Sequence, residues 1–306
     1  MMESPDLNQT VRGIVVPLVT PLDSDDRLDR AALERVIEHV IRGGVSGLFI
    51  LGTTGEGPSL SYELRSELID AACRQVAGRV SVFVGVSDNV YERTMAVAHI
   101  AAKAGASAVV LAPPCYFRIS QFDLLRYVER FSSDSPLPLF LYNIPSLTKT
   151  VFEPETVRHA SAFPNVVGLK DSSGDLKYLS AVIRSTAADF PVMMGPEEML
   201  VEAMQAGAIG GVCGGANLNP GLFTELHRLT ASGNLESARK LQKRVCEISD
   251  ALYTVGDRGT SYLRGLKSAM AAAGLCSGHC AIPIAQFTPE ERRTLESRFE
   301  ALGCTV

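Results

Sequence analysis

Short apolar runs alternate with amphipathic helical patterns over most of this chain, and this alternation constrains its fold more than any other feature. Eight runs rich in Val, Ile, Leu and Gly predict buried strands, because they are short and bounded by turn residues. Strands that alternate with helices form βαβ units and a parallel sheet. The eight predicted strands are residues 13–19, 47–51, 80–86, 108–111, 137–142, 166–170, 192–194 and 210–213.

Helical patterns fill the intervals between these strands, and several end at a glycine that favours a helix C-terminus. They cover residues 30–42, 61–76, 91–104, 121–131, 176–187 and 197–206. We therefore expect an α/β fold, a (β/α)8 or TIM barrel over residues 11–218. Beyond the eighth strand the pattern is helical only, which predicts a C-terminal helical appendage over 219–306. A doubly wound open sheet is the alternative, but no Gly-x-Gly-x-x-Gly opens its first helix.

Composition excludes several classes of protein. The chain has 306 residues and a net charge of −5, with no basic stripe, so we expect no nucleic-acid partner. No apolar run reaches the roughly 18 residues of a membrane span. The first ten residues lack the pattern of a signal peptide, and the seven cysteines read as reduced thiols, so we expect a cytoplasmic protein. Cys276, His279 and Cys280 lack a second ligand pair at zinc spacing, so we expect no metal.

Polar residues cluster where the predicted strands end. In a parallel barrel the carboxyl ends of all strands meet at one face, which is where chemistry takes place. Polarity of loops alone would not put a tyrosine and a lysine last in two consecutive buried strands. The residues at these ends are Thr53, Thr54, Gly55 and Glu56 after the second strand, Tyr142 on the fifth, Lys170 on the sixth, Glu197 and Glu198 after the seventh, and Gly214–Asn217 after the eighth.

Lys170 suggests the chemistry. A lysine at the exit of a buried strand is costly to desolvate as an ammonium, so it is either functional or reaches water with its head. Burial favours the neutral amine, which is the form that attacks a carbonyl. Tyr142 could move the protons of imine formation, and Thr53, Thr54 and Gly55 offer hydroxyls and N–H groups for a carboxylate. This set describes Schiff-base chemistry on a 2-oxo acid.

Other chemistries find less support in the sequence. There is no P-loop, no His-Glu-x-x-His and no Gly-x-Ser-x-Gly. The glycines after the eighth strand could cradle a phosphate, or they could be small because another group packs close to them.

Three motifs together give a resemblance to a known family. They are Gly52–Glu56, Tyr142-Asn143-Ile144-Pro145 and Gly168-Leu169-Lys170. The chain resembles the dihydrodipicolinate synthase / N-acetylneuraminate lyase family of class I aldolases from about residue 13 to residue 287. The resemblance implies that Lys170 forms the Schiff base with pyruvate and that no cofactor is needed. A second Gly-Leu-Lys, ending at Lys267, lies in a helical pattern and is not a candidate.

The same resemblance implies further roles. Tyr142 would shuttle protons, Thr53 would relay them, and Thr54 would hold the substrate carboxylate. Tyr116 would be lent to the active site of a neighbouring subunit, in a homotetramer built as a dimer of dimers.

Departures from the family pattern bear on the substrate. Leu147 stands where dihydrodipicolinate synthases carry an arginine for the distal carboxylate of aspartate semialdehyde. Glu197 and Glu198 match an acidic pair that binds substrate hydroxyls in N-acetylneuraminate lyases. Gly214 stands where those lyases use a serine. The C-terminal part, from the Gly210–Asn217 stretch with Cys213, looks closest to 4-hydroxy-2-oxoglutarate aldolases.

We therefore expect a carbon–carbon lyase that uses pyruvate and an aldehyde to form or cleave a 4-hydroxy-2-oxo acid or a 2-keto-3-deoxy sugar acid. The alternatives are a dihydrodipicolinate synthase, a sugar-acid dehydratase with the same imine, and a silent barrel that binds 2-oxo acids. The expected substrate-binding residues are Thr54, Gly55, Leu147, Glu197, Glu198, Cys213 and Gly214.

Overall fold

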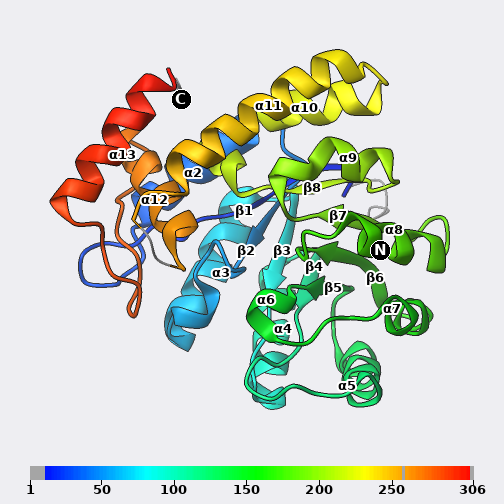
Figure 1. The fold of residues 1–306 in the computed structure, drawn as a ribbon. Helices are drawn as coiled ribbons and strands as arrows, with labels where there is room; N and C mark the ends of the chain where they lie inside the picture. The colour runs from blue at the N-terminus through cyan, green and yellow to red at the C-terminus, as the bar shows by residue number, and fades with distance from the viewer. Residues whose placement is uncertain (1–10, 257–258, 304–306) are drawn as a thin grey trace.

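Eight parallel strands close into a barrel in the computed structural model, which describes residues 11–256 and 259–303 (Figure 1). The strands pair in chain order, and β8 pairs with β1. The first ten residues, on which the signal-peptide prediction rests, lie outside the described residues. The strands are β1 Gly13–Pro17, β2 Gly47–Ile50, β3 Ser81–Gly85, β4 Ala108–Leu111, β5 Leu139–Asn143, β6 Val166–Asp171, β7 Val192–Met194 and β8 Gly210–Val212.

Helices follow the strands and surround the barrel (Figure 1). Many begin at a Ser, Asp or Asn whose side chain accepts from a backbone N–H of the first turn, as Asp29 does for Ala32. None of the helices in the described part of the chain is long and apolar enough to cross a membrane. The helices are α2 Arg30–Arg42, α3 Tyr62–Val76, α4 Tyr91–Ala104, α5 Gln121–Asp134, α6 Pro145–Thr148, α7 Pro154–Ala160, α8 Leu176–Ser185, α9 Leu200–Gln205, α10 Pro220–Ala231, α11 Leu235–Leu252, α12 Ser261–Ala272 and α13 Pro289–Ala301.

The predicted TIM barrel is confirmed, with differences at the ends of its elements. Strands β5 and β6 each run one residue beyond Tyr142 and Lys170, so neither residue is the last of its strand. Asn143 and Asp171 are register partners there and extend the pairing. The short helices α6 and α7, which each begin with a proline, were not predicted. Helix α13 lies within the predicted C-terminal helical appendage.

Side chains of the barrel fall into two buried layers. Those inside form one apolar cluster that includes Phe49, Phe140, Tyr142 and Met193. Those outside, between strands and helices, form a second and larger cluster. Side chains alternate along a strand, and residues side by side in adjacent strands share a face. Because Lys170 is the register partner of both Tyr142 and Met193, its side chain points into the barrel.

Gly168 shows why the Gly-Leu-Lys motif needs its glycine. It is the register partner of Phe140, whose ring occupies the space beside it. A Cβ at Gly168 would lie 2.3 Å from Cε1 of Phe140, which is far too close for two carbon atoms. The glycine thus lets a phenylalanine fill the barrel two residues before Lys170.

The C-terminal helices α11, α12 and α13 gather on one side of the barrel (Figure 1). Helix α10 follows β8 as other helices follow their strands, and it contacts β1 and α9. It therefore takes the place of the eighth barrel helix. The division of the chain at residue 218 stays a prediction, and a boundary after α10 accords better with this packing.

Candidate active site

Lys170 and Tyr142 lie together at the carboxyl end of the barrel. The lysine Nζ lies 4.1 Å from the ring centre of Tyr142 and 4.9 Å from that of Phe49. Lys170 is 6% exposed and Tyr142 is also 6% exposed. Both line a pocket with Thr53, Thr54 and other polar side chains, so the structure brings these four predicted residues together.

The hydroxyl of Tyr142 belongs to a polar cluster. It lies 3.4 Å from Oγ1 of Thr53, and it also contacts Ser172 and Lys170. Burial is the largest single influence on the pKa of Tyr142 and raises it. The Lys170 ammonium and the surrounding hydrogen bonds outweigh burial, so the pKa of the phenol lies below its ordinary value. A phenol of lowered pKa, in contact with an amine and a hydroxyl, is suited to passing protons between them.

Asn143 and Asp171 join strands β5 and β6 at their carboxyl ends. Nδ2 of Asn143 donates to Oδ1 of Asp171 at 2.9 Å, and Oδ1 of Asn143 accepts from the backbone N–H of Phe152. Asp171 also accepts from the backbone and hydroxyl of Ser173. Each lies next in sequence to Tyr142 or Lys170, so this pair supports the register that places phenol beside amine.

The turn after β2 carries the two threonines. Thr54 Oγ1 lies 3.1 Å from the hydroxyl of Tyr262, and both residues line the pocket. Gly55 lies behind them, because its carbonyl accepts from the hydroxyl of Thr20 at 2.6 Å and a Cβ on it would lie 2.8 Å from the carbonyl oxygen of Leu18. Gly55 is therefore outside the lining of this pocket, contrary to its expected place.

Glu197 and Glu198 form an acidic wall of the same pocket. Glu197 accepts from the backbone N–H of Gly215 at 2.7 Å and from the hydroxyl of Tyr253 at 3.1 Å. Burial first, and then the charge of Glu198, raise the pKa of Glu197 to about 7 in spite of these donors. Glu198 accepts from the hydroxyl of Ser249.

Two tyrosines from the C-terminal helices complete the pocket, and strand-end reasoning missed both. Tyr253 follows α11 and Tyr262 lies in α12, and their rings are edge to face at 4.8 Å. A Cβ at Gly214 would lie 1.6 Å from the hydroxyl oxygen of Tyr262. Gly214 thus leaves the space that Tyr262 fills.

The glycines after β8 are explained by close packing. A phosphate bound here would need the backbone N–H of Gly215 as a donor, but this N–H already donates to Glu197. At the end of this stretch, the side chain of Asn217 accepts from the backbone N–H of Val19 and donates to the carbonyl of Pro17. Within residues 11–256 and 259–303, no three His, Cys, Asp or Glu side chains gather as a metal-ligating group.

Besides Gly55, three predicted site residues lie apart from this pocket. Leu147, in α6, is 54% exposed and lines an adjoining hollow that also contacts Thr53 and Tyr142. The side chain of Cys213 packs in the outer layer of the barrel, which excludes the direct substrate contact expected for it. Tyr116 is 76% exposed and stacks edge to face on the similarly exposed Phe117.

Comparison with known proteins identifies the family. Residues 10–302 match the model of the dihydrodipicolinate synthetase family. A 4-hydroxy-tetrahydrodipicolinate synthase of Salinibacter ruber is 32% identical, over 96% of this chain and 97% of the relative. The 4-hydroxy-tetrahydrodipicolinate synthase of Thermus thermophilus is 34% identical, over 95% of this chain and 96% of the relative. These names favour the synthase, the alternative in the sequence analysis, over a 4-hydroxy-2-oxo acid aldolase.

Solved structures agree with this result. A dihydrodipicolinate synthase of Bacteroides thetaiotaomicron has a TM-score of 0.93 and 44% identity, over 98% of this chain and all of the other. A prophage protein of the same family from E. coli, solved with pyruvate, has a TM-score of 0.90 and 26% identity, over 96% and 99% of the two chains. Together with the barrel and its buried lysine, these matches show that the chain belongs to the dihydrodipicolinate synthetase family and is a lyase of the class I aldolase type.

Proposed function

We propose that this enzyme forms an imine between Lys170 and the keto carbon of pyruvate, and uses it to make or break a carbon–carbon bond. The observation that carries the proposal is the contact of Lys170 with Tyr142, whose hydroxyl lies beside that of Thr53. Among the described residues that line the pocket, no other pair of side chains combines an amine nucleophile with a neighbouring proton relay.

The reaction follows from these groups. The neutral amine adds to the keto carbon, and loss of water gives the imine, with Tyr142 moving protons onto and off the departing oxygen. Loss of a proton from the methyl carbon of pyruvate gives an enamine. That carbon attacks the aldehyde carbon, and the new alkoxide takes a proton. Water then releases the product and restores Lys170, so no cofactor is consumed.

In this proposal the turn at residues 52–57, called the threonine turn, holds the carboxylate of pyruvate. Thr53 and Thr54 line the pocket together with Lys170. Hydroxyl donors bind a carboxylate and leave the keto carbon directed at the amine.

For the second substrate we propose an aldehyde whose distal end carries hydroxyls, giving a 4-hydroxy-2-oxo acid or a 2-keto-3-deoxy sugar acid. The far wall of the pocket presents Glu197, Glu198, Tyr253 and Tyr262, and Lys170 is the one cationic side chain among the described lining residues. Carboxylates accept hydrogen bonds from hydroxyls but repel another carboxylate.

Aspartate semialdehyde is the second candidate, and the names of the curated relatives favour it. Its distal carboxylate would need a cation near Leu147. Arg65 lines the adjoining hollow, but it lies 3.6 Å from Asp88 and donates to the carbonyl of Leu60. This candidate therefore requires Arg65 or another arginine to reorient toward the substrate.

Borohydride reduction in the presence of pyruvate tests the imine. The peptide that contains Lys170 should gain a reduced pyruvyl group, and Lys170→Met should gain none. Lys267, in the second Gly-Leu-Lys, serves as the internal control because it is also buried. An unmodified protein, or a label on Lys267, would refute the assignment and would leave a silent binding barrel as the better explanation.

A substrate panel then separates the acceptors. We expect clear cleavage of at least one 4-hydroxy-2-oxo acid or 2-keto-3-deoxy sugar acid, and weak condensation of pyruvate with aspartate semialdehyde. A kcat/KM for aspartate semialdehyde of about 10⁴ M⁻¹s⁻¹ or more would establish the synthase instead. Release of water without release of pyruvate would indicate the dehydratase. Location in the cytoplasm, the homotetramer, and the absence of a metal or of a nucleic-acid partner stay predictions.

A further inference from the structure

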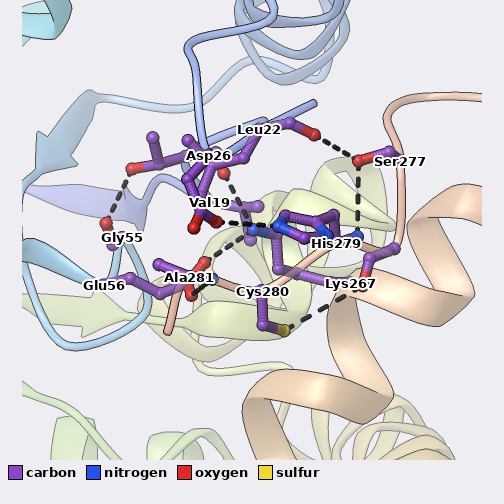
Figure 2. A network of polar contacts seen from close by, with 12 residues as sticks. Val19, Leu22, Asp26, Gly55, Glu56, Lys267, Ser277, His279, Cys280 and Ala281 are labelled. Carbon is purple, nitrogen blue, oxygen red and sulfur yellow. Dashed lines mark hydrogen bonds and ion pairs between the residues drawn. The ribbon is translucent and has the colours of Figure 1, made fainter. Parts of the chain in front are cut away.

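A buried ion pair joins the C-terminal helices to the threonine turn. Nζ of Lys267, in α12, donates to Oε1 of Glu56 at 2.6 Å, and both side chains are 0% exposed (Figure 2). Glu56 follows Thr53, Thr54 and Gly55 directly. The mechanism above uses neither member of the pair.

The pair closes a ring of contacts around the turn. Lys267 Nζ also donates to the carbonyl of Thr20 at 2.9 Å, and the hydroxyl of Thr20 donates to the carbonyl of Gly55. The second oxygen of Glu56 accepts from the backbone N–H of Ala281 at 2.7 Å. Figure 2 shows that Lys267 and Ala281 reach Glu56 from separate C-terminal segments. Both carboxylate oxygens are thus held from outside the barrel.

Helix α12 touches the turn at a second point. Five residues before Lys267, Tyr262 places its hydroxyl 3.1 Å from Oγ1 of Thr54. Glu56 itself has a left-handed backbone, with φ of 55°, and its N–H donates to the carbonyl of Thr53. A non-glycine residue in this conformation carries strain that its surroundings must offset. The contacts of its carboxylate provide that restraint.

Stability alone is a weak explanation for such a pair. Two buried charges lose much hydration, and an apolar pair of similar size is often as stable. Position is a better explanation, because the hydroxyl of Thr53 lies at the limit of hydrogen-bond distance from Tyr142 and a small shift would separate them.

We infer that the ion pair of Lys267 and Glu56 positions the turn at residues 52–57, so that the C-terminal helices set the distance between the Thr53 and Tyr142 hydroxyls. Both residues act through Thr53 and are positioning residues. The inference rests on the proposed function, in which Thr53 relays protons.

The double variant Glu56→Gln/Lys267→Met tests this inference. It removes both charges and keeps side chains of similar size, and the oxygen of the glutamine amide can still accept from the backbone N–H of Ala281. We expect backbone amide exchange of residues 52–57 to become at least about tenfold faster. We expect kcat to fall by about 10- to 100-fold, since a misplacement near 1 Å can cost this much. Glu56→Asp, which keeps the charge but shortens the side chain, gives the same two readouts if the double variant does not fold.

A comparison with Thr53→Val distinguishes positioning from general damage. If the pair acts through the Thr53 hydroxyl, adding the double variant to Thr53→Val should lower kcat by less than about twofold further. If the double variant lowers kcat by the same factor in the Thr53→Val background as in the parent, the inference is overturned. Unchanged amide exchange of the turn, or faster exchange with an unchanged kcat, would also overturn it.

Asp26→Asn is the matched control. Asp26 binds His279 at 2.8 Å and so joins the barrel to the same C-terminal segment without touching the turn (Figure 2). We expect it to leave both the exchange of residues 52–57 and kcat within about twofold of the parent. The exchange measurement needs no substrate. If the wild-type protein forms no pyruvate adduct, the proposed function is refuted. The amide exchange of residues 52–57 still tests whether the ion pair positions the turn.

Discussion

Tyr142 and Lys170 are register partners on adjacent strands, with the lysine Nζ 4.1 Å from the centre of the tyrosine ring. The pair is held by backbone hydrogen bonds of a parallel sheet and, one residue further on, by the Asn143–Asp171 hydrogen bond. Reacting groups fixed on rigid strands lose little freedom when substrate binds. The amine and the phenol therefore need little rearrangement to exchange protons through a bound substrate.

Removing the phenol hydroxyl should abolish most of the turnover while the fold survives. We expect Tyr142→Phe to lower kcat by about 10²- to 10⁴-fold, because it deletes a proton carrier and little volume. Steady-state kinetics with the best substrate of the panel measures this. Tyr127→Phe, at a half-buried tyrosine of α5 outside the pocket, should keep parental turnover. A near-normal kcat in the Tyr142→Phe enzyme would mean that another group carries the proton.

The acidic wall should make stability depend on pH through Glu197. Its pKa in the folded state, about 7, is above the ordinary value of 4.5. The folded protein therefore keeps a proton that the unfolded chain loses between these values, and stability falls as pH rises from 4.5 to 7. This residue alone contributes a slope of up to about 1.4 kcal/mol per pH unit.

Glu197→Gln should remove that contribution. Thermal melts at pH values across the same window should show a smaller loss of Tm in the variant than in the parent. Glu92→Gln, at an exposed position, should retain the parental dependence. Identical pH profiles for the parent and Glu197→Gln would show that Glu197 titrates near its ordinary value.

An arginine in place of Leu147 should create the missing carboxylate site. We expect Leu147→Arg to raise kcat/KM for aspartate semialdehyde by about tenfold or more, since a bidentate guanidinium binds a carboxylate well. Leu147→Met, which keeps the apolar character, is the control. A parent enzyme that is already efficient with this aldehyde, and gains nothing from arginine, would contradict the interpretation of Leu147.

Tyr116 should complete the site of a neighbouring subunit. Tyr116 is 76% exposed and lies beside the exposed Phe117. Two exposed aromatic side chains are unfavourable on the surface of a monomer and are typical of a subunit interface. Light scattering should therefore show an oligomer. Mixing Lys170→Met with Tyr116→Ala after dissociation should restore about a quarter of the activity, because half of randomly formed pairs then hold one intact site. An active monomer, or mixtures that stay inactive, would argue that each chain uses its own aromatics.

Much of the fold could be predicted because its signal is local. Each strand is a short apolar run with turn residues at its ends, and the barrel follows from their number and spacing. Lys170 and Tyr142 could be found for the same reason, since a polar residue near the end of a buried strand stands out from its neighbours. Leu147 and Tyr116 were placed by family motifs, and the structure puts both outside the central pocket.

Contacts between distant segments could not be predicted. Glu56 and Lys267 are 211 residues apart, and nothing near either one indicates its partner. Tyr253 and Tyr262 lie in helical patterns whose inward faces depend on how α11 and α12 pack. Cys213 was misplaced because strand alternation turns its side chain outward, one residue after the inward Val212.

The walls of the pocket have separate origins. The end of the pocket assigned to pyruvate in our proposal is built from β5, β6 and the turn after β2, whereas Tyr253 and Tyr262 come from segments that follow the barrel. Mutation could therefore change which aldehyde is accepted without altering how the keto acid is activated. An ancestral barrel could keep the lysine imine while its helical extension diversified, and enzymes with unrelated products could then descend from one way of activating a keto acid.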